Sequence, residues 1–235
     1  MGTKPQWLIN FRDKQNSRSR PEWLRKALDR ARTPVEEDPA VVEQNQNKAQ
    51  GDFTAELAAV LREHEGGRFG YDSWFGRGTS SGPVDPPKPP TQMTIDEVLE
   101  WQNTHNPAGP ETTAIGAYQI VDQPNARTLS GLVRTMGLTG KEVFTAELQD
   151  RMAVQLMKGR GLDKFLAGEI DGDTFANKIA REWASMPVLK PDKRRGKSIA
   201  IGRSYYSGDG INKAFRSPKK FEEYKNIYSL ADIGG

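Results

Sequence analysis

The sequence predicts an α+β domain that is mostly α. Apolar residues recur at helical spacing in several segments after residue 119, and strand-like alternation is scarce. Residues 76–110 are rich in Gly, Pro and Ser, which predicts a loop-rich, small β insertion after Tyr71. The 235 residues suffice for one sizeable domain with extensions.

Charge and polarity divide the chain into three parts. Residues 1–50 carry a net charge of +3 and few large apolar groups, so we expect a basic N-terminal arm or linker. A compact domain is expected over residues 51–215, with a C-terminal helix and tail over residues 216–235 that packs on the domain or extends it. The centre is acidic, at −6 for residues 51–189, whereas residues 190–235 carry +6. Basic ends suit an anionic polymer such as nucleic acid or cell wall, although a charge run is often only a solvated face.

Composition excludes several classes of chemistry. The chain has no cysteine, which removes disulfides and thiolate catalysis, and its two histidines lie far apart in sequence. We therefore expect no metal site and no cofactor. No apolar run approaches the ~20 residues of a membrane-spanning helix, and the N-terminus lacks the apolar stretch of a signal peptide. Neither membrane insertion nor a signal peptide is expected.

The first core helix is predicted over residues 53–64, with Asp52 as its N-cap. Its apolar stripe of Phe53, Leu57 and Leu61 is continued by Glu65, which should therefore face the interior. Burial, and then the negative end of the helix dipole, should both raise the pKa of this carboxyl. Glu65 is thus a candidate general acid, although a glutamate in a last helical turn is more often simply solvated.

Further helices follow from capping signals and apolar faces. The segment Thr94–Glu97 is a capping box that opens a helix through Trp101. Asp173 is the expected N-cap of a helix that runs through Trp183, whose indole we expect in the core rather than on a sugar. Pro218 is expected at the first position of the last helix. Two more apolar faces, each closed by a glycine, are Leu129/Leu132/Val133/Met136 and Leu148/Met152/Leu156/Met157.

Five short motifs occur in a fixed order that resembles the lysozyme-like phage muramidases of the lambda endolysin type. The motifs are Glu65-Gly66-Gly67, Gly70-Tyr71-Asp72, Gly116-Ala117-Tyr118-Gln119, Leu148-Gln149-Asp150-Arg151 and Glu182-Trp183-Ala184-Ser185-Met186-Pro187. The resemblance covers about residues 53–215. Residues 93–102 and 202–210 look more like the virion-associated or prophage branch of that family.

The resemblance implies a lysozyme-like fold and cleavage of the β-1,4 bond between N-acetylmuramic acid and N-acetylglucosamine in peptidoglycan. Glu65 takes the position of the catalytic acid, and Tyr71, Tyr118 and Gln119 match residues that line the substrate. The enzyme would be phage-encoded or virion-associated and act on the cell wall in the periplasm. From the sequence alone, Tyr118 could equally be packed in the core.

The reaction type depends on a second carboxylate. Asp72 is the nearest acidic candidate, and a hydrolase would need it at ~5 Å or at ~6.5–9.5 Å from Glu65. Lambda-like members resemble lytic transglycosylases, in which one Glu suffices and the 6-hydroxyl of the sugar closes a 1,6-anhydro ring. We favour the transglycosylase, with Asp72 bonding backbone amides. Both alternatives stay open at this point.

The two ends of the chain indicate further contacts, both with sugars and with other partners. Tyr205 and Tyr206 lie in a Gly-rich polar segment and are candidates for stacking on sugars. Residues 1–50 could dock on phage tail or virion proteins, and a structural tail protein that only binds peptidoglycan is the rival hypothesis. Nucleic acid is not an expected partner, because no recognition motif accompanies the basic residues 193–195 and 219–220.

Overall fold

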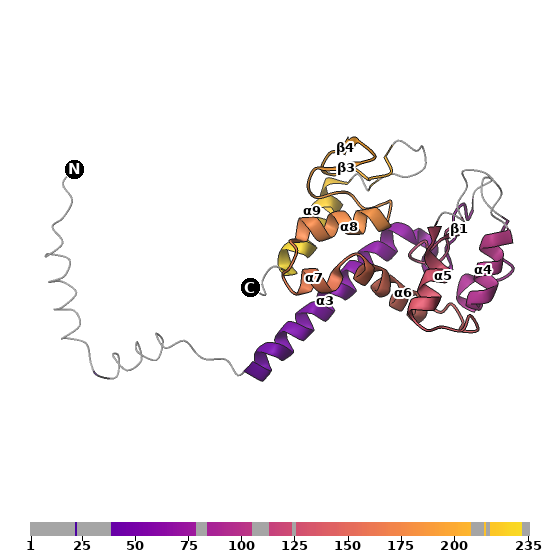
Figure 1. Ribbon diagram of the computed structural model, residues 1–235, viewed down its shortest axis with the longest axis horizontal. Helices are drawn as coiled ribbons and strands as arrows, with labels where there is room; N and C mark the ends of the chain where they lie inside the picture. The colour runs from indigo at the N-terminus through magenta and orange to yellow at the C-terminus, as the bar shows by residue number, and fades with distance from the viewer. Residues whose placement is uncertain are drawn as a thin grey trace. The chain divides into compact units, whose positions relative to one another are not determined.

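A computed structural model describes residue 22 and residues 39–78, 84–104, 113–123, 126–207, 214 and 217–231 (Figure 1). The chain divides into two compact units, Met1–Asn45 and Gln46–Gly235. The second unit is mostly helical and has small antiparallel strand pairs, which confirms the expected mostly α, α+β fold.

Helix α3 (Pro39–Glu65) is 27 residues long and ends at the candidate acid. The prediction of a start at Asp52 was wrong, because Asp52 lies inside this helix. Most of the residues between 40 and 50 are good helix formers such as Ala, Glu, Gln and Lys, so the helix extends into polar sequence. Only its second half carries the apolar stripe, and Phe53, Leu57 and Leu61 are buried as expected.

A small β region follows α3, as the sequence predicted. Trp74 pairs with Ile115, and Ile115 pairs in turn with Ile120 across the tight turn that joins them. A two-residue antiparallel pair, β1 (Asp122–Gln123) and β2 (Ala126–Arg127), comes directly after it. The region therefore connects the end of α3 to residues 113–127.

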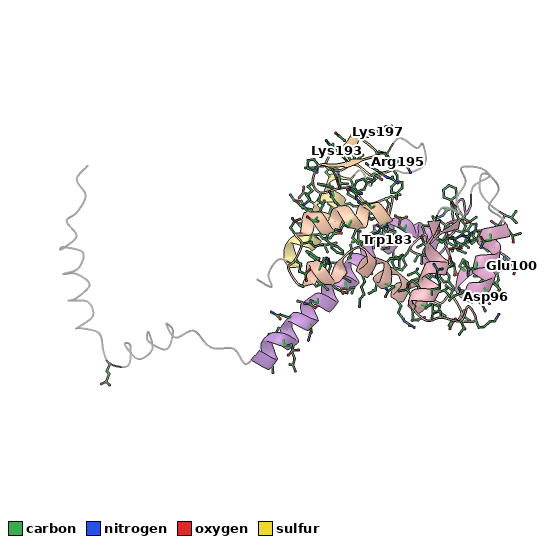
Figure 2. The ribbon with its side chains drawn as sticks, in the orientation of Figure 1. Asp96, Glu100, Trp183, Lys193, Arg195 and Lys197 are labelled. Carbon is green, nitrogen blue, oxygen red and sulfur yellow. The ribbon has the colours of Figure 1, made fainter. Side chains whose placement is uncertain are left out.

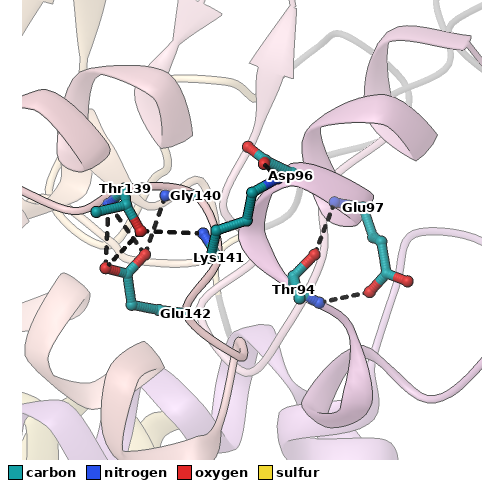
Figure 3. Close-up of polar contacts among 7 residues, drawn as sticks. All are labelled: Thr94, Asp96, Glu97, Thr139, Gly140, Lys141 and Glu142. Carbon is teal, nitrogen blue, oxygen red and sulfur yellow. Dashed lines mark hydrogen bonds and ion pairs between the residues drawn. The ribbon is translucent and has the colours of Figure 1, made fainter.

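Helix α4 (Ile95–Thr104) begins at the expected capping box (Figure 3). The Glu97 carboxylate accepts the Thr94 N–H at 2.7 Å, and the Thr94 hydroxyl accepts the Glu97 N–H at 3.2 Å. The first turn also carries Asp96, whose carboxylate pairs with Lys141 at 2.7 Å. Gly140 has φ +89°, and a Cβ at that position would lie 2.1 Å from Oδ1 of Asp96. The helix start is thus held closely against residues 139–142.

The remaining elements form the helical body of the second unit. They are α5 (Thr128–Thr135), α6 (Ala146–Gly159), α7 (Leu162–Leu166), α8 (Gly172–Glu182), the hairpin strands β3 (Asp192–Arg194) and β4 (Lys197–Ile199), and α9 (Pro218–Ala231). Pro218 is the first residue of α9, as expected. The predicted N-cap of α8 was wrong: Asp171 rather than Asp173 accepts the N–H of Thr174, at 2.5 Å.

Three helices far from α3 in sequence, α7, α8 and α9, contribute aromatic rings to the core around it. Helices α8 and α9 lie side by side (Figure 1). Phe53 of α3 packs against Phe165, Phe175 and Tyr228, with ring centroids 5.0–6.3 Å apart. Trp183 is buried too, and its indole N–H donates to the Tyr118 carbonyl at 3.1 Å, which confirms a core role (Figure 2). Among the helices that the structure describes, none combines the length and the apolar character needed to cross a bilayer.

Candidate active site

The Glu65 carboxyl lies partly buried at the end of α3, against the segment that follows α8. The Ser185 hydroxyl and the Ser185 backbone N–H both donate to Oε1 of Glu65, at 2.6 and 3.2 Å. Burial raises the pKa of Glu65, and the two bonds from Ser185 act in the opposite direction. The result is a desolvated carboxyl with a fixed orientation, which is what a proton donor near neutral pH needs.

Glycine is required where the chain leaves Glu65. A Cβ on Gly66 would lie 2.9 Å from the Arg62 carbonyl oxygen and 3.0–3.1 Å from Cα and the carbonyl oxygen of Ala117. The end of α3 therefore touches the backbone of the turn over residues 116–119. This contact joins the first and third of the sequence motifs in space.

The turn itself is held from inside by Gln149 of α6. Its Oε1 accepts the Ala117 N–H at 2.8 Å, and its Nε2 donates to the carbonyls of Phe144 and Tyr71 at 2.9 and 3.2 Å. A Cβ on Gly116 would lie 2.5 Å from that same Oε1, so only glycine fits there. Gln149 is completely buried, and its three hydrogen bonds fix the segments at Ala117, Phe144 and Tyr71 relative to one another.

A polar network lies one turn before Glu65 on α3. Arg62 donates to the phenol oxygens of Tyr71 and Tyr118 at 3.1 and 3.4 Å, and it pairs with Asp150 at 3.5 Å. Both phenols donate to Asp150, Tyr71 at 2.9 Å and Tyr118 at 2.5 Å. Burial and the neighbouring carboxylate raise the pKa of both tyrosines, so both remain neutral donors.

The predicted substrate residues differ in their accessibility. Tyr118 is buried, so its ring is part of the core and only its hydroxyl belongs to the network. Tyr71 and Gln119 are partly exposed. Gln119 has φ +48°, an uncommon conformation for a residue other than glycine, and its side chain donates to the Gly116 carbonyl at 2.9 Å. Such backbone strain often accompanies a functional site.

Asp72 has a structural contact. Its Oδ1 accepts the N–H of Thr91 at 2.9 Å, and its backbone carbonyl accepts a bond from Arg77. This agrees with the expected role of bonding backbone amides and joins the loop after α3 to the segment before α4.

Tyr205 and Tyr206 belong to another cluster, around the β3–β4 hairpin. Tyr205 is buried, its phenol donates to Asp192, and Arg181 lies over its ring. Burial and the Asp192 carboxylate raise the pKa of Tyr205 to about 12. Tyr206 is partly exposed, with Arg194 3.9 Å from its ring centroid. Both rings therefore already carry guanidinium groups on a face.

Four residues of the site were not identified as functional from the sequence. They are Arg62, Gln149, Asp150 and Ser185. Arg62 could have been identified from the sequence, because a residue three positions before Glu65 lies on the same face of the helix. The other three stood inside quoted motifs, but only the fold shows what each one touches. Within the ranges that the structure describes, no group of His, Asp or Glu side chains could hold a metal ion.

Comparison with known proteins gives one match. A family model described as Endolysin matches residues 96–211, just under half of the chain. The matched range contains Tyr118, Gln119 and Ser185, but it begins after Glu65. Over these residues the chain is similar to endolysins, and the match supports a phage-encoded enzyme that degrades the bacterial cell wall. No curated protein and no solved structure matches the chain.

Proposed function

From the endolysin match and the environment of Glu65, we propose that the protein is a muramidase that cleaves the β-1,4 bond between N-acetylmuramic acid and N-acetylglucosamine in peptidoglycan. The single observation that carries this proposal is the partly buried Glu65 carboxyl, held by Ser185 and with a raised pKa. A glycosidic oxygen must gain a proton as it leaves, and a carboxyl that stays neutral close to pH 7 can supply it.

The proton transfer can be followed atom by atom. Ser185 donates to Oε1, so the proton of the neutral acid resides on Oε2. Oε2 passes this proton to the bridging oxygen as the bond to the anomeric carbon breaks. Glu65 is then a carboxylate and can act as the base for the second half of the reaction.

We favour a lytic transglycosylase for that second half. The Glu65 carboxylate accepts the proton of the 6-hydroxyl as its oxygen attacks the anomeric carbon, which gives a 1,6-anhydro end. The structural contact of Asp72 with the Thr91 N–H supports this choice, since one glutamate then suffices. A hydrolytic lysozyme that uses Asp72 is the alternative, in which water replaces the 6-hydroxyl.

Digestion of purified peptidoglycan with the wild type and with Glu65→Gln tests the proposal. We expect clearing by the wild type and a loss of at least about a hundredfold in the variant, because general acid catalysis contributes that much. Undiminished clearing by Glu65→Gln would remove Glu65 from the mechanism. Product masses then separate the two reactions, because anhydro ends are lighter than reducing ends by one water.

The biological setting of this activity is a phage-encoded enzyme that acts in the periplasm, either during lysis or as part of the particle. Residues 1–50 are the proposed contact with tail or virion proteins. Deleting them should prevent incorporation into particles and leave the cleavage activity of the isolated protein unchanged. Binding of peptidoglycan without any cleavage by the full chain would instead favour a structural tail protein.

A further inference from the structure

The short β3–β4 hairpin carries exposed positive charge. Strand β3 pairs with β4 in antiparallel register, and Arg195 and Gly196 form the turn. Both turn residues have positive φ, +48° and +78°, as a two-residue type I′ hairpin turn requires. The hairpin follows α8 and the Ser185 segment directly in the chain.

Most other basic side chains nearby are engaged by neighbours. The engaged residues are Lys190 with Asp171, Arg194 with Tyr205 and Tyr206, Lys219 with Glu223, and Lys220 with Glu63. The positive charge of residues 190–235 is therefore partly neutralised within the fold. The basic residues 219–220, which the sequence analysis considered together with residues 193–195, form ion pairs with Glu223 and Glu63.

Three cations on the hairpin differ from these. Lys193, Arg195 and Lys197 are exposed, and none of them forms an ion pair within the described part of the chain. Figure 2 shows the three side chains together on the hairpin. We call them the hairpin cations.

Arg195 has an unusual backbone conformation for an arginine. A non-glycine residue in the left-handed region is strained, and type I′ turns strongly favour Asn, Asp or Gly at this position. The chain nevertheless has an arginine there. A strained exposed residue that keeps a positive charge at a hairpin tip points to a binding role.

The hairpin is also firmly anchored. Asp192 accepts from Arg181 of α8 at 2.9 Å and from the phenol of Tyr205, and Arg194 donates to the Tyr205 carbonyl at 3.0 Å. The base of the hairpin is thus fixed to α8, so the hairpin cations are presented without a large loss of backbone freedom on binding.

The same segment links these cations to the candidate acid. Ser185 contacts Glu65, and the first residue of β3, Asp192, follows it by seven positions, a reach of at most ~24 Å. A polymer held at Glu65 extends well beyond that distance. In peptidoglycan such a polymer carries peptide stems with free carboxylates at regular intervals.

We propose that Lys193, Arg195 and Lys197 form a docking surface for the carboxylate-bearing peptide stems of peptidoglycan, separate from the bond that is cleaved. This rests on the proposed function for the choice of polymer. Weak contacts to several peptide stems along one glycan chain raise the local concentration of glycan at Glu65. Because the cations are exposed, the attraction is screened by salt.

The test is a sedimentation assay with insoluble peptidoglycan, in the Glu65→Gln background so that the polymer stays intact. Replacing all three hairpin cations by glutamine should weaken binding about tenfold at low salt, as three exposed charge pairs would. The matched control is K158Q/K164Q/K178Q, which removes the same charge from exposed positions on α6, α7 and α8 and should bind normally. Equal weakening by the control would overturn the proposal.

Two further measurements identify the ligand, and a third tests the strain at Arg195. Removal of the stems with an amidase should abolish the difference between the parent and the hairpin variant. Hairpin-dependent binding that survives this removal, or that is stronger on duplex DNA or on anionic lipid vesicles, contradicts the proposal. R195N should raise the melting temperature by about 2 °C while it weakens binding, since Asn tolerates the turn better. A lower melting temperature would refute the argument from strain.

Failure of the muramidase proposal and failure of the proposed docking surface give different results. If Glu65→Gln cleaves like the wild type, the proposed mechanism fails, and the binding comparison is repeated at 4 °C with that active protein. If cleavage depends on Glu65 but binding ignores the hairpin cations, only the docking surface is rejected.

Discussion

At the level of single residues, Glu65 experiences two opposing effects. Burial disfavours its charge, while the hydroxyl and the amide of Ser185 stabilise it. Burial is the larger effect, so the pKa is raised. A group whose pKa is raised on folding stabilises the protein below its unfolded pKa, and this contribution is lost as the pH rises through the folded pKa.

Glu65→Gln should therefore stabilise the protein at neutral pH while it removes activity. We expect a gain of about 1 kcal/mol at pH 7, typical for relief of strain at a functional site. The gain should vanish below pH 4.5, the usual pKa of glutamic acid, where the wild-type residue is neutral in both states. Thermal unfolding at pH 4 and pH 7 measures this. Glu56→Gln, an exposed change on the same helix, is the control, and equal gains at both pH values would contradict the prediction.

Ser185→Ala should move the alkaline limb of the activity profile to higher pH. The lost hydroxyl bond lowers the pKa of Glu65 in the wild type, so its removal raises that pKa further and keeps the acid protonated. The maximal rate should fall by about tenfold, because the carboxyl is less well oriented. Activity from pH 4 to pH 9 measures both effects. Ser198→Ala on the exposed hairpin serves as the control, and a limb that stays in place would rule out this role for Ser185.

At the level of elements, the site depends on the close approach of α3 to the turn over residues 116–119. Gly66 sits at that contact with backbone atoms at 2.9–3.1 Å from its missing Cβ, so no flexible side chain can yield to a larger residue. Gly51 lies inside α3 with open space around it, whereas Gly66 is the first residue after the end of α3. The two glycines form a matched pair.

Gly66→Ala should destabilise the protein by about 1–3 kcal/mol, as overpacking does, and should lower the cleavage rate. Gly51→Ala should have the opposite effect and stabilise α3 by about 1 kcal/mol, the difference in helix propensity. Urea unfolding measures both changes. Similar values for the two variants would show that the contact at Gly66 is loose.

Some features of the elements could be predicted from the sequence, and others could not. The apolar stripe that includes Phe53 and the capping box at Thr94 depend on neighbours three or four residues away, and both were predicted correctly. The predicted start of α3 was wrong, because the mostly polar residues 43–50 give no apolar pattern although their propensity permits a helix. The contacts of Gln149 and Ser185 join segments 32 and 120 residues apart, and no local pattern encodes which carbonyl or carboxyl they meet.

At the level of the whole molecule, the compact unit that contains the site begins at Gln46, inside α3. The side chains of residues 43–49 are exposed, so the helix before Gln50 contributes little burial. A chain that starts at Gln46 retains all the contacts described for Glu65.

Deletion of residues 1–45 should therefore leave the melting temperature within about 2 °C of the full chain, corresponding to less than about 1 kcal/mol. The rate of peptidoglycan clearing should be unchanged as well. Calorimetry and a turbidity assay measure the two quantities. A large loss of stability would show that the first unit supports the second.

The bond between Ser185 and Glu65 has a consequence for the newly made chain. The two residues lie 120 positions apart, and α9, still later in the sequence, packs against the helix that precedes Ser185. At roughly 5–20 residues per second, the ribosome needs on the order of ten seconds to make the intervening segment. During that time the carboxyl has neither its hydrogen-bond donors nor its buried surroundings. A nascent chain consequently lacks the environment of Glu65 on which the proposed activity depends until the segments that carry Ser185 and α9 have been made.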